Sequence, residues 1–219
     1  MIVKNKIIQL LDNEQGLKRF LLVFYIVGAA GFAIPFTRVF FSMLTPLALM
    51  LNYFILVYHH KSGWRRGWVF ALIYFLGFFV EVAGVQTGMI FGNYEYGSGL
   101  GIKLAETPLL IGFNWLMLVY TTFVLTDSRK LPVLAKVFIA SGLMVIYDII
   151  TEQTAPLLNM WSWDDGNIPL QNYLAWFVIA FVMHGLIRIS GVRIQNNFAK
   201  YILLLQTFFF LILYLISLL

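Results

Sequence analysis

The chain has 219 residues, of which 61% are hydrophobic and only 11% are charged. A soluble domain needs roughly 25% charged residues, so this composition excludes an ordinary soluble protein and indicates an integral membrane protein. The net charge of +5 suggests an acidic partner, but the distribution of basic residues along the chain explains it without one, and no nucleic acid is expected as a partner. The absence of cysteine excludes disulfides, thiol nucleophiles and Cys-ligated metals.

Apolar runs long enough to cross a bilayer, about 17 to 25 residues each, divide the chain. They predict an all-α fold, a polytopic membrane bundle of seven transmembrane helices near residues 20–36, 39–58, 68–87, 109–126, 133–150, 173–190 and 201–218. Residues 1–19 are predicted to form an interfacial amphipathic segment, and residues 20–219 a single membrane domain. The beginning of the chain lacks the order of a cleaved signal peptide, so the first span is expected to be retained.

Basic residues alternate between the two sides of the predicted bundle. Thirteen of the 15 lie before the first span or in every second connection after it, namely Lys4, Lys6, Lys18, Arg19, Lys61, Arg65, Arg66, Arg129, Lys130, Lys136, Arg188, Arg193 and Lys200. Only Arg38 and Lys103 fall on the other side. By the positive-inside rule, this pattern predicts that the N-terminus is inside and the C-terminus is outside. The expected location is a bacterial plasma (inner) membrane.

Two long connections, residues 88–108 and 151–172, lie on the predicted outer side and contain few basic residues. Long loops between tightly packed helices usually cover a site or a cavity. The first loop is rich in glycine, which suits a re-entrant or capping segment. We therefore expect the functional site on the outer half of the bundle.

Carboxyl groups are predicted inside the membrane at that level. Placing Glu81 in a spanning helix costs about 3 kcal/mol, so it is a functional candidate whose partner must be found. Asp148 reaches a similar depth in its own helix, and Glu152 lies four residues later on the same face. Two carboxyls in one dry pocket keep a proton available for general acid catalysis. The structural alternative is that Glu81 and Asp148 only bind Tyr, Trp or Asn side chains and lock the bundle.

Amide and aromatic side chains begin two other helices near the same level, at Asn114 and Trp115 and at Asn172 and Trp176. Such aromatics form either an interfacial belt or a slot whose π faces stabilise a cation. No Asp-rich pair and no cluster of His and Glu with ligand spacing is present, so no metal is expected.

Several of these positions form a longer pattern. It runs Glu81-x-x-Gly84-x-x-Thr87-Gly88-x-x-Phe91-Gly92-x-Tyr94-x-Tyr96, continues with Leu100-Gly101, Pro108 and Trp115, and resumes with Asp148, Pro156, Trp161-x-Trp163, Gly166, Pro169, Asn172 and Trp176. This pattern resembles the membrane-bound carotenoid 1,2-hydratase family, also called carotenoid biosynthesis proteins. The family favours proline just before the loop phenylalanine, where this chain has Ile90.

The resemblance implies a cofactor-independent hydro-lyase that adds water across the terminal C1,C2 double bond of a linear carotenoid such as lycopene or γ-carotene. Either Glu81 or Asp148 would donate the proton while the other orients water, and the order of the two stays open. Candidates for substrate binding or water orientation are Thr87, Tyr94, Tyr96, Asn114, Trp115, Glu152, Trp163, Asn172 and Trp176. The expected partners are a carotenoid in the lipid bilayer and water, with other carotenoid-pathway membrane enzymes as further candidates.

Two other functions fit the same residues. A carotenoid end-group cyclase also begins with protonation of an alkene by a carboxylic acid, but it must exclude water until a proton is lost. A non-enzymatic protein for carotenoid binding or transport would use Glu81 as a proton relay and keep pigment binding without either carboxyl group.

Overall fold

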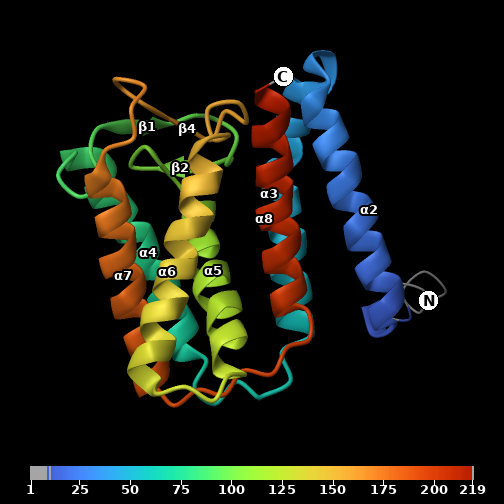
Figure 1. Ribbon diagram of the computed structural model, residues 1–219, viewed down its shortest axis with the longest axis vertical. Coiled ribbons are helices and arrows are strands. Elements are labelled where there is room, and N and C mark those ends of the chain that lie inside the picture. The colour runs from blue at the N-terminus through green and yellow to red at the C-terminus, as the bar shows by residue number, and fades with distance from the viewer. Residues whose placement is uncertain (1–8, 10, 219) are drawn as a thin grey trace.

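The computed structural model describes residues 9 and 11–218, and within them it contains seven helices long and apolar enough to cross a membrane (Figure 1). The helices are α2 (Glu14–Ala33), α3 (Pro35–Tyr58), α4 (Trp68–Thr87), α5 (Leu110–Asp127), α6 (Val133–Glu152), α7 (Leu170–Ile189) and α8 (Ala199–Ser217). The predicted all-α bundle of seven spanning helices is therefore confirmed. Residues 14–19 of the predicted interfacial segment belong to α2, and its residues 1–8 and 10 lie outside the described residues, so an interfacial role for the segment stays a prediction.

Helix α5 occupies the centre of the bundle. It contacts α3, α4, α6, α7 and α8. In its apolar membrane-spanning stretch 72% of the residues are buried, compared with 17–39% in the other helices. Helix α2 lies at the periphery beside α3 and α8 (Figure 1). Since α5 is surrounded by other helices, side chains on any of its faces can contribute to an internal site.

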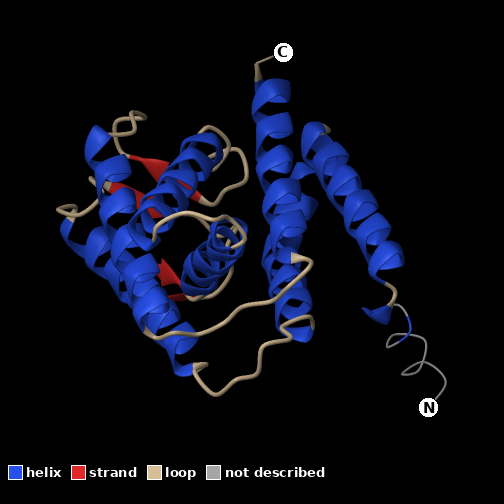
Figure 2. Ribbon diagram, turned by 60° about the horizontal axis from the view of Figure 1, so that its bottom comes forward, coloured by secondary structure: helices blue, strands red, loops and turns tan. Residues whose placement is uncertain are grey.

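Short strands join the loops at one end of the bundle, called the strand end below (Figure 2). Strand β1 (Tyr94–Tyr96) pairs antiparallel with β4 (Trp161–Trp163), and β2 (Lys103–Leu104) pairs with β3 (Thr107–Pro108). The β1–β4 pair ties the two long loops predicted at residues 88–108 and 151–172 into one lid. Sequence analysis did not predict these strands, because each is only two or three residues long and depends on a distant partner.

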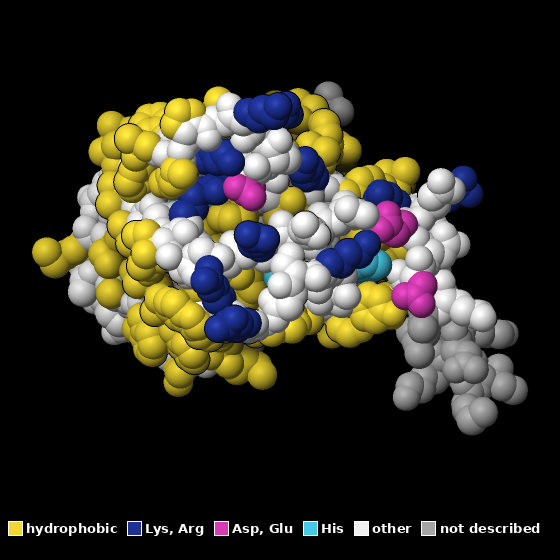
Figure 3. Space-filling view, turned by 90° about the horizontal axis from the view of Figure 1, so that it is seen from below, with side chains coloured by type: hydrophobic (Ala, Val, Ile, Leu, Met, Phe, Trp, Pro, Cys, Tyr) yellow, Lys and Arg dark blue, Asp and Glu magenta, His cyan; other side chains and the backbone are white. Residues whose placement is uncertain are grey.

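The opposite end of the bundle carries most of the positive charge and is called the basic end below. Lys and Arg side chains spread across this face with apolar side chains around them (Figure 3). Some of these basic side chains form ion pairs that join neighbouring helices; Arg188 of α7 and Lys136 of α6, for example, both bind Asp127 at the end of α5. The structure thus segregates charge as the sequence predicted, while the side of the membrane that each end faces stays a prediction.

Helix α4 ends at Gly88, where the lid begins. Gly88 adopts a left-handed conformation with φ of +64°, and its amide donates to the Gly84 oxygen at 2.8 Å. Glycine tolerates this conformation without steric cost, which is why it commonly follows the last turn of a helix. The chain can therefore reverse within a few residues and bring β1 back over the end of α4.

Helices α4 and α5 approach closely at Gly112. A Cβ atom at this position would lie 2.8 Å from the main-chain oxygen of Tyr74, which cannot move without moving α4. We expect Gly112→Ala to lower the free energy of unfolding by about 1–3 kcal/mol, as overpacking does in other cores. Thermal unfolding of the detergent-solubilised protein measures this change.

Gly142 in α6 provides the matched control, because a Cβ atom there meets nothing within 4 Å. Gly142→Ala should leave stability unchanged or raise it slightly, since alanine favours helix. Equal melting temperatures for the two variants would show that the α4–α5 contact is not close enough to matter.

Candidate functional site

Glu81 lies inside the bundle at the end covered by the lid, and its side chain accepts hydrogen bonds from three donors. The hydroxyls of Tyr94 and Tyr96 donate to Oε2 at 2.6 and 2.7 Å, and Trp115 Nε1 donates to Oε1 at 2.9 Å. Glu81 is only 3% exposed. Because phenol and indole groups donate to both oxygens, this environment suits a carboxylate that accepts hydrogen bonds.

Burial, followed by the nearby Glu81 carboxylate, raises the pKa of Tyr94 and of Tyr96 well above the usual value of a phenol. Both hydroxyls therefore keep their protons across the physiological pH range. Each tyrosine remains a fixed donor to Glu81 and does not compete with it for a proton.

A second carboxyl group of the site is Glu152, at the last residue of α6. Trp161 Nε1 and Trp163 Nε1 donate to its Oε2 at 2.9 and 2.8 Å. Both indoles come from β4, so the same two-stranded lid that supplies the phenols for Glu81 supplies the indoles for Glu152. The lid thus holds both carboxyl groups.

Side-chain alternation in the lid explains how four donors reach the site. The register pairs Tyr94 with Trp163 and Tyr96 with Trp161, and side chains two residues apart in a strand share a face. The residue between the tyrosines, Glu95, is exposed. The Tyr-x-Tyr and Trp-x-Trp spacings, which the sequence shows as part of the family pattern, are therefore also the signal for a strand pair with an aromatic inner face.

Asp148 and Glu152 are bridged by one amide. Asn172 Nδ2 donates to Asp148 Oδ2 at 2.9 Å and, more weakly, to Glu152 Oε1 at 3.4 Å. Asp148 is buried, and among the described residues Asn172 is the only one whose side chain donates a hydrogen bond to it. The four-residue spacing of the two acids places them together on one face of α6, so they form a close pair.

The three carboxyl groups have no basic partner in the described part of the chain. The ion pairs formed there involve Glu14 and Asp127, both at the basic end. Neutral donors alone therefore stabilise the buried acids, which is an expensive arrangement within a membrane and marks functional positions in many membrane proteins.

A small cavity of about 20 Å³ lies beside Glu81, and neither Asp148 nor Glu152 lines it. Its lining includes Glu81 and Asn172 together with Phe91, Tyr94, Tyr96, Ile111, Trp161 and Trp176. A cavity of that size has room for one water molecule, and Glu81, Tyr94, Tyr96 and Asn172 offer it hydrogen-bonding groups. Trp176 also stacks on Trp115, with ring centroids 4.1 Å apart and an angle of 22° between the planes, so an aromatic wall stands beside the cavity.

Most candidate residues from the sequence meet in this place, and two do not. Thr87 is exposed at the end of α4, where its hydroxyl donates to the Ala83 oxygen at 2.6 Å. Asn114 is half-buried, makes no side-chain hydrogen bond to the described residues, and does not line the cavity. It precedes Trp115 by one residue on α5 and so points in another direction. Neither residue belongs to the site.

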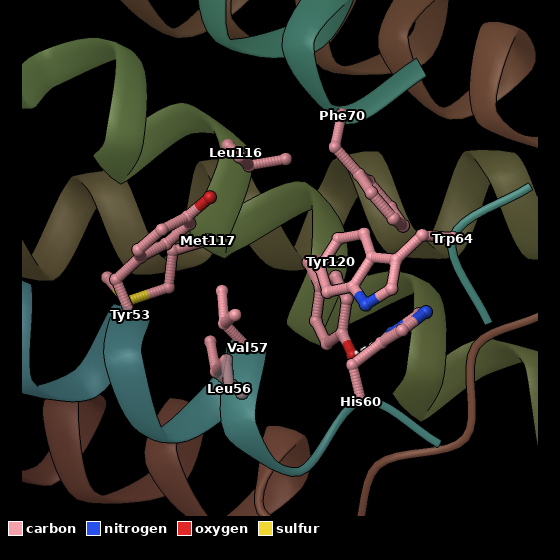
Figure 4. A pocket seen from close by; sticks show the side chains of 9 residues that line it. All are labelled: Tyr53, Leu56, Val57, His60, Trp64, Phe70, Leu116, Met117 and Tyr120. Atoms are coloured by element: carbon pink, nitrogen blue, oxygen red, sulfur yellow. Dashed lines mark hydrogen bonds between the residues drawn. The ribbon is translucent and has the colours of Figure 1, made fainter. Parts of the chain in front are cut away.

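A different small cavity lies toward the basic end, lined by His60 and Tyr120 among apolar side chains (Figure 4). His60 Nδ1 is hydrogen-bonded to the Tyr120 hydroxyl at 2.9 Å, and Asn196 Nδ2 donates to the same hydroxyl at 3.0 Å. Burial lowers the pKa of His60, so its ring stays neutral at pH 7. These contacts attach the α3–α4 and α7–α8 connections to α5 and serve the fold.

Residues with metal-ligand chemistry do not gather in the described part of the chain, where no group of three or more His, Cys, Asp or Glu side chains could hold a metal ion. The donors around the carboxyl groups are phenols, indoles and one amide. Together with the carboxyl groups, these donors and aromatic faces can transfer protons, orient water and stabilise a cation.

Residues 22–219 match a protein family described as carotenoid biosynthesis protein. No curated protein and no solved structure matches the chain. The matched region contains all seven spanning helices except the first part of α2, and both halves of the lid. The resemblance drawn from the pattern between residues 81 and 176 is thus confirmed at the level of the family. The chain belongs to the carotenoid biosynthesis protein family and is a seven-helix membrane protein involved in carotenoid biosynthesis.

Proposed function

We propose that the protein is a carotenoid hydratase that adds water across the terminal C1,C2 double bond of a linear end group, as in lycopene or γ-carotene, and produces a 1-hydroxy carotenoid. The observation that carries this proposal is the one-water cavity between Glu81 and Asn172, with the Asp148–Glu152 pair directly behind the amide. Family membership supports a carotenoid as the substrate.

The reaction needs a proton donor, a water molecule and a base, and it involves no change of oxidation state. A carboxylic acid transfers its proton to C2, and the electrons of the double bond form the new C–H bond. The tertiary cation left at C1 is captured by the oxygen of water. A carboxylate then removes a proton from that oxygen, so the net change is the addition of one water molecule.

Hydrogen bonding divides these roles between the acids. Glu81 accepts three hydrogen bonds and lines the cavity, which suits a carboxylate that holds water and receives its proton. Glu152 also has three donors, whereas Asp148 has only Asn172. The acid with the fewest donors is the one that best retains a proton. We assign proton donation to Asp148 and water activation to Glu81.

The aromatic wall supports a cationic intermediate. The stacked rings of Trp115 and Trp176 and the ring of Tyr94 present π faces or edges near the cavity, and an indole face stabilises a nearby cation by about 0.5–2 kcal/mol. The cavity itself is too small for a branched alkene end. Binding of the carotenoid therefore requires Asn172 or Trp176 to move, which would also open the way from Asp148 to the substrate.

Room for water separates hydration from cyclisation. A cyclase would need a dry site until the ring closes, whereas the polar cavity beside Glu81 has the volume of one water molecule. This feature favours the hydratase over the cyclase.

The location of the charges supports an orientation in which the basic end faces the cytoplasm of a bacterial cell (Figure 3). The N-terminus would then be inside, the C-terminus outside, and the lid at the outer surface of the plasma membrane. Water would reach the site through the lid, and the carotenoid would enter from the bilayer. Other membrane enzymes of the pathway are the proposed neighbours.

Expression in lycopene-producing cells tests the function directly. We expect pigments whose mass has increased by one water molecule, absent from cells that carry the empty vector. A ring-containing pigment of unchanged mass would identify a cyclase. Unaltered lycopene in cells that contain the folded protein in their membranes would contradict both enzymatic functions.

A further inference from the structure

Glu152 is a buried acid that the mechanism above does not use. It is only 5% exposed and ends α6 beneath the lid. Its Oε2 atom accepts hydrogen bonds from Trp161 Nε1 and Trp163 Nε1, and these two bonds fasten β4 to the bundle. The side-chain oxygen of a glutamine could accept both bonds without the cost of a buried ionisable group. Fastening the lid therefore does not explain why an acid occupies this position.

The proposed reaction leaves the acids in the wrong protonation state after each turnover. Asp148 has given its proton to the substrate, and Glu81 has received one from water. Asp148 is only 1% exposed and does not line the cavity, so the water beside Glu81 does not reach it. Its side-chain donor among the described residues is Asn172 Nδ2, an amide nitrogen that donates hydrogen bonds but does not accept a proton. The next turnover therefore needs another acid that can pass a proton to Asp148.

Glu152 is placed to be that acid. It follows Asp148 by four residues on the same face of α6. Asn172 Nδ2 holds both carboxyl groups, at 2.9 Å from Asp148 Oδ2 and 3.4 Å from Glu152 Oε1. Glu152 is also the last residue of α6, so it lies closer than Asp148 to the loops of the strand end. When Asp148 loses its proton, two negative charges face one amide, and their repulsion favours uptake of a proton by the pair.

We propose that Glu152 returns a proton to Asp148 after each turnover and takes its own proton from water at the lid. The O–H bond of a hydronium ion breaks as that of Glu152 forms, and the O–H bond of Glu152 then breaks as that of Asp148 forms. Glu81 releases its extra proton to water that leaves the cavity, so one proton enters and one leaves in each cycle. Glu152 acts through Asp148 and does not touch the substrate, so it is a positioning residue for the proton. This role rests on the proposed function.

Glu152→Gln tests this role, because glutamine keeps an oxygen for both indoles but cannot pass on a proton. Hydration is measured with protein in excess, so that each molecule reacts once, and again with pigment in excess. We expect the single-turnover rate to equal that of the wild type, because Asp148 starts with its proton. The steady-state rate should fall by about 10²-fold, at the lower end of the contribution of a proton-transfer group.

A purely structural role for Glu152 would not separate the two rates. Both rates unchanged in Glu152→Gln, or both reduced by the same factor, would overturn the proposal. If the wild-type protein hydrated no pigment under either condition, the proposed function itself would be wrong, and this role with it.

Two control variants distinguish proton transfer from damage to the lid. Trp163→Phe removes one indole bond and keeps the acid, so the ratio of its two rates should stay that of the wild type. Asp164→Asn removes an exposed acid next to Trp163 and should change neither rate. If Trp163→Phe separated the two rates as strongly as Glu152→Gln, the effect would belong to the lid and the proposal would be overturned.

Glu152→Ala keeps the proposal testable if Glu152→Gln does not fold. Alanine vacates the space of the carboxyl group and its neighbouring methylene, which acetate can occupy. Acetate should raise the steady-state rate of this variant and leave its single-turnover rate unchanged. An equal rise in both rates would mean that acetate repairs the lid, and it would overturn the proposal.

Discussion

Asp148→Asn is expected to reduce the rate of carotenoid hydration by a factor of about 10²–10⁴, the usual contribution of a general acid. Asparagine has nearly the same size as aspartate but cannot transfer a proton to C2 of the substrate. Its side-chain oxygen can still accept the hydrogen bond that Asn172 Nδ2 makes at 2.9 Å, so the bundle should remain folded. The measurement is the rate at which the 1-hydroxy pigment appears in isolated membranes containing equal amounts of each protein.

Asp165→Asn makes the same chemical change at an exposed position between β4 and α7 and should leave the rate unchanged. If Asp148→Asn kept the full hydration rate, the proton donor would have to be another group and the assignment of Asp148 would be wrong. A parallel melting curve distinguishes a lost proton donor from a damaged fold, because only the latter lowers the melting temperature.

Glu81→Gln is expected to have the second large effect, on both rate and stability. The carboxylate accepts hydrogen bonds at both oxygens, from two phenols and one indole. Glutamine can accept at one end only, so its amide nitrogen would face a donor in a buried place. We expect the hydration rate to fall by at least about 10²-fold and the free energy of unfolding to fall by about 1–3 kcal/mol.

Tyr96→Phe separates these two effects, since it removes one donor to Glu81 and leaves the carboxylate in place. It should lose stability while keeping most of the activity. Glu95→Gln, on the exposed face of β1 next to Tyr96, is the control for the change of charge and should alter neither property. If Tyr96→Phe lost as much activity as Glu81→Gln, the hydrogen-bonded network would matter more than the carboxylate as a base.

The lid connects these predictions to the fold. Strand pairing between β1 and β4 aims two phenols at Glu81 and two indoles at Glu152. A change that breaks the pairing should therefore disturb both acids together. This coupling explains why the loops between α4 and α5 and between α6 and α7 must be long enough to reach each other.

Part of the candidate site could be anticipated from residue type and local spacing. An acid in an apolar run stands out because ionisable groups are costly in a membrane, which singled out Glu81 and Asp148. The spacing of four residues placed Glu152 on the same helix face as Asp148.

The sequence by itself determined the number of spanning helices, their positions to within a few residues, the separation of basic and neutral connections, and the family. These properties depend on local composition, because a bilayer selects any run that is long and apolar enough. Only the tertiary structure decided which side chains meet. Helix α5 is apolar on nearly every side, so its sequence does not indicate which face carries the site. Residue type alone also could not show that Trp115 binds Glu81 while its neighbour Asn114 does not. Likewise, the pairing of β1 with β4 arises from contacts between segments far apart in the chain, which no local pattern specifies.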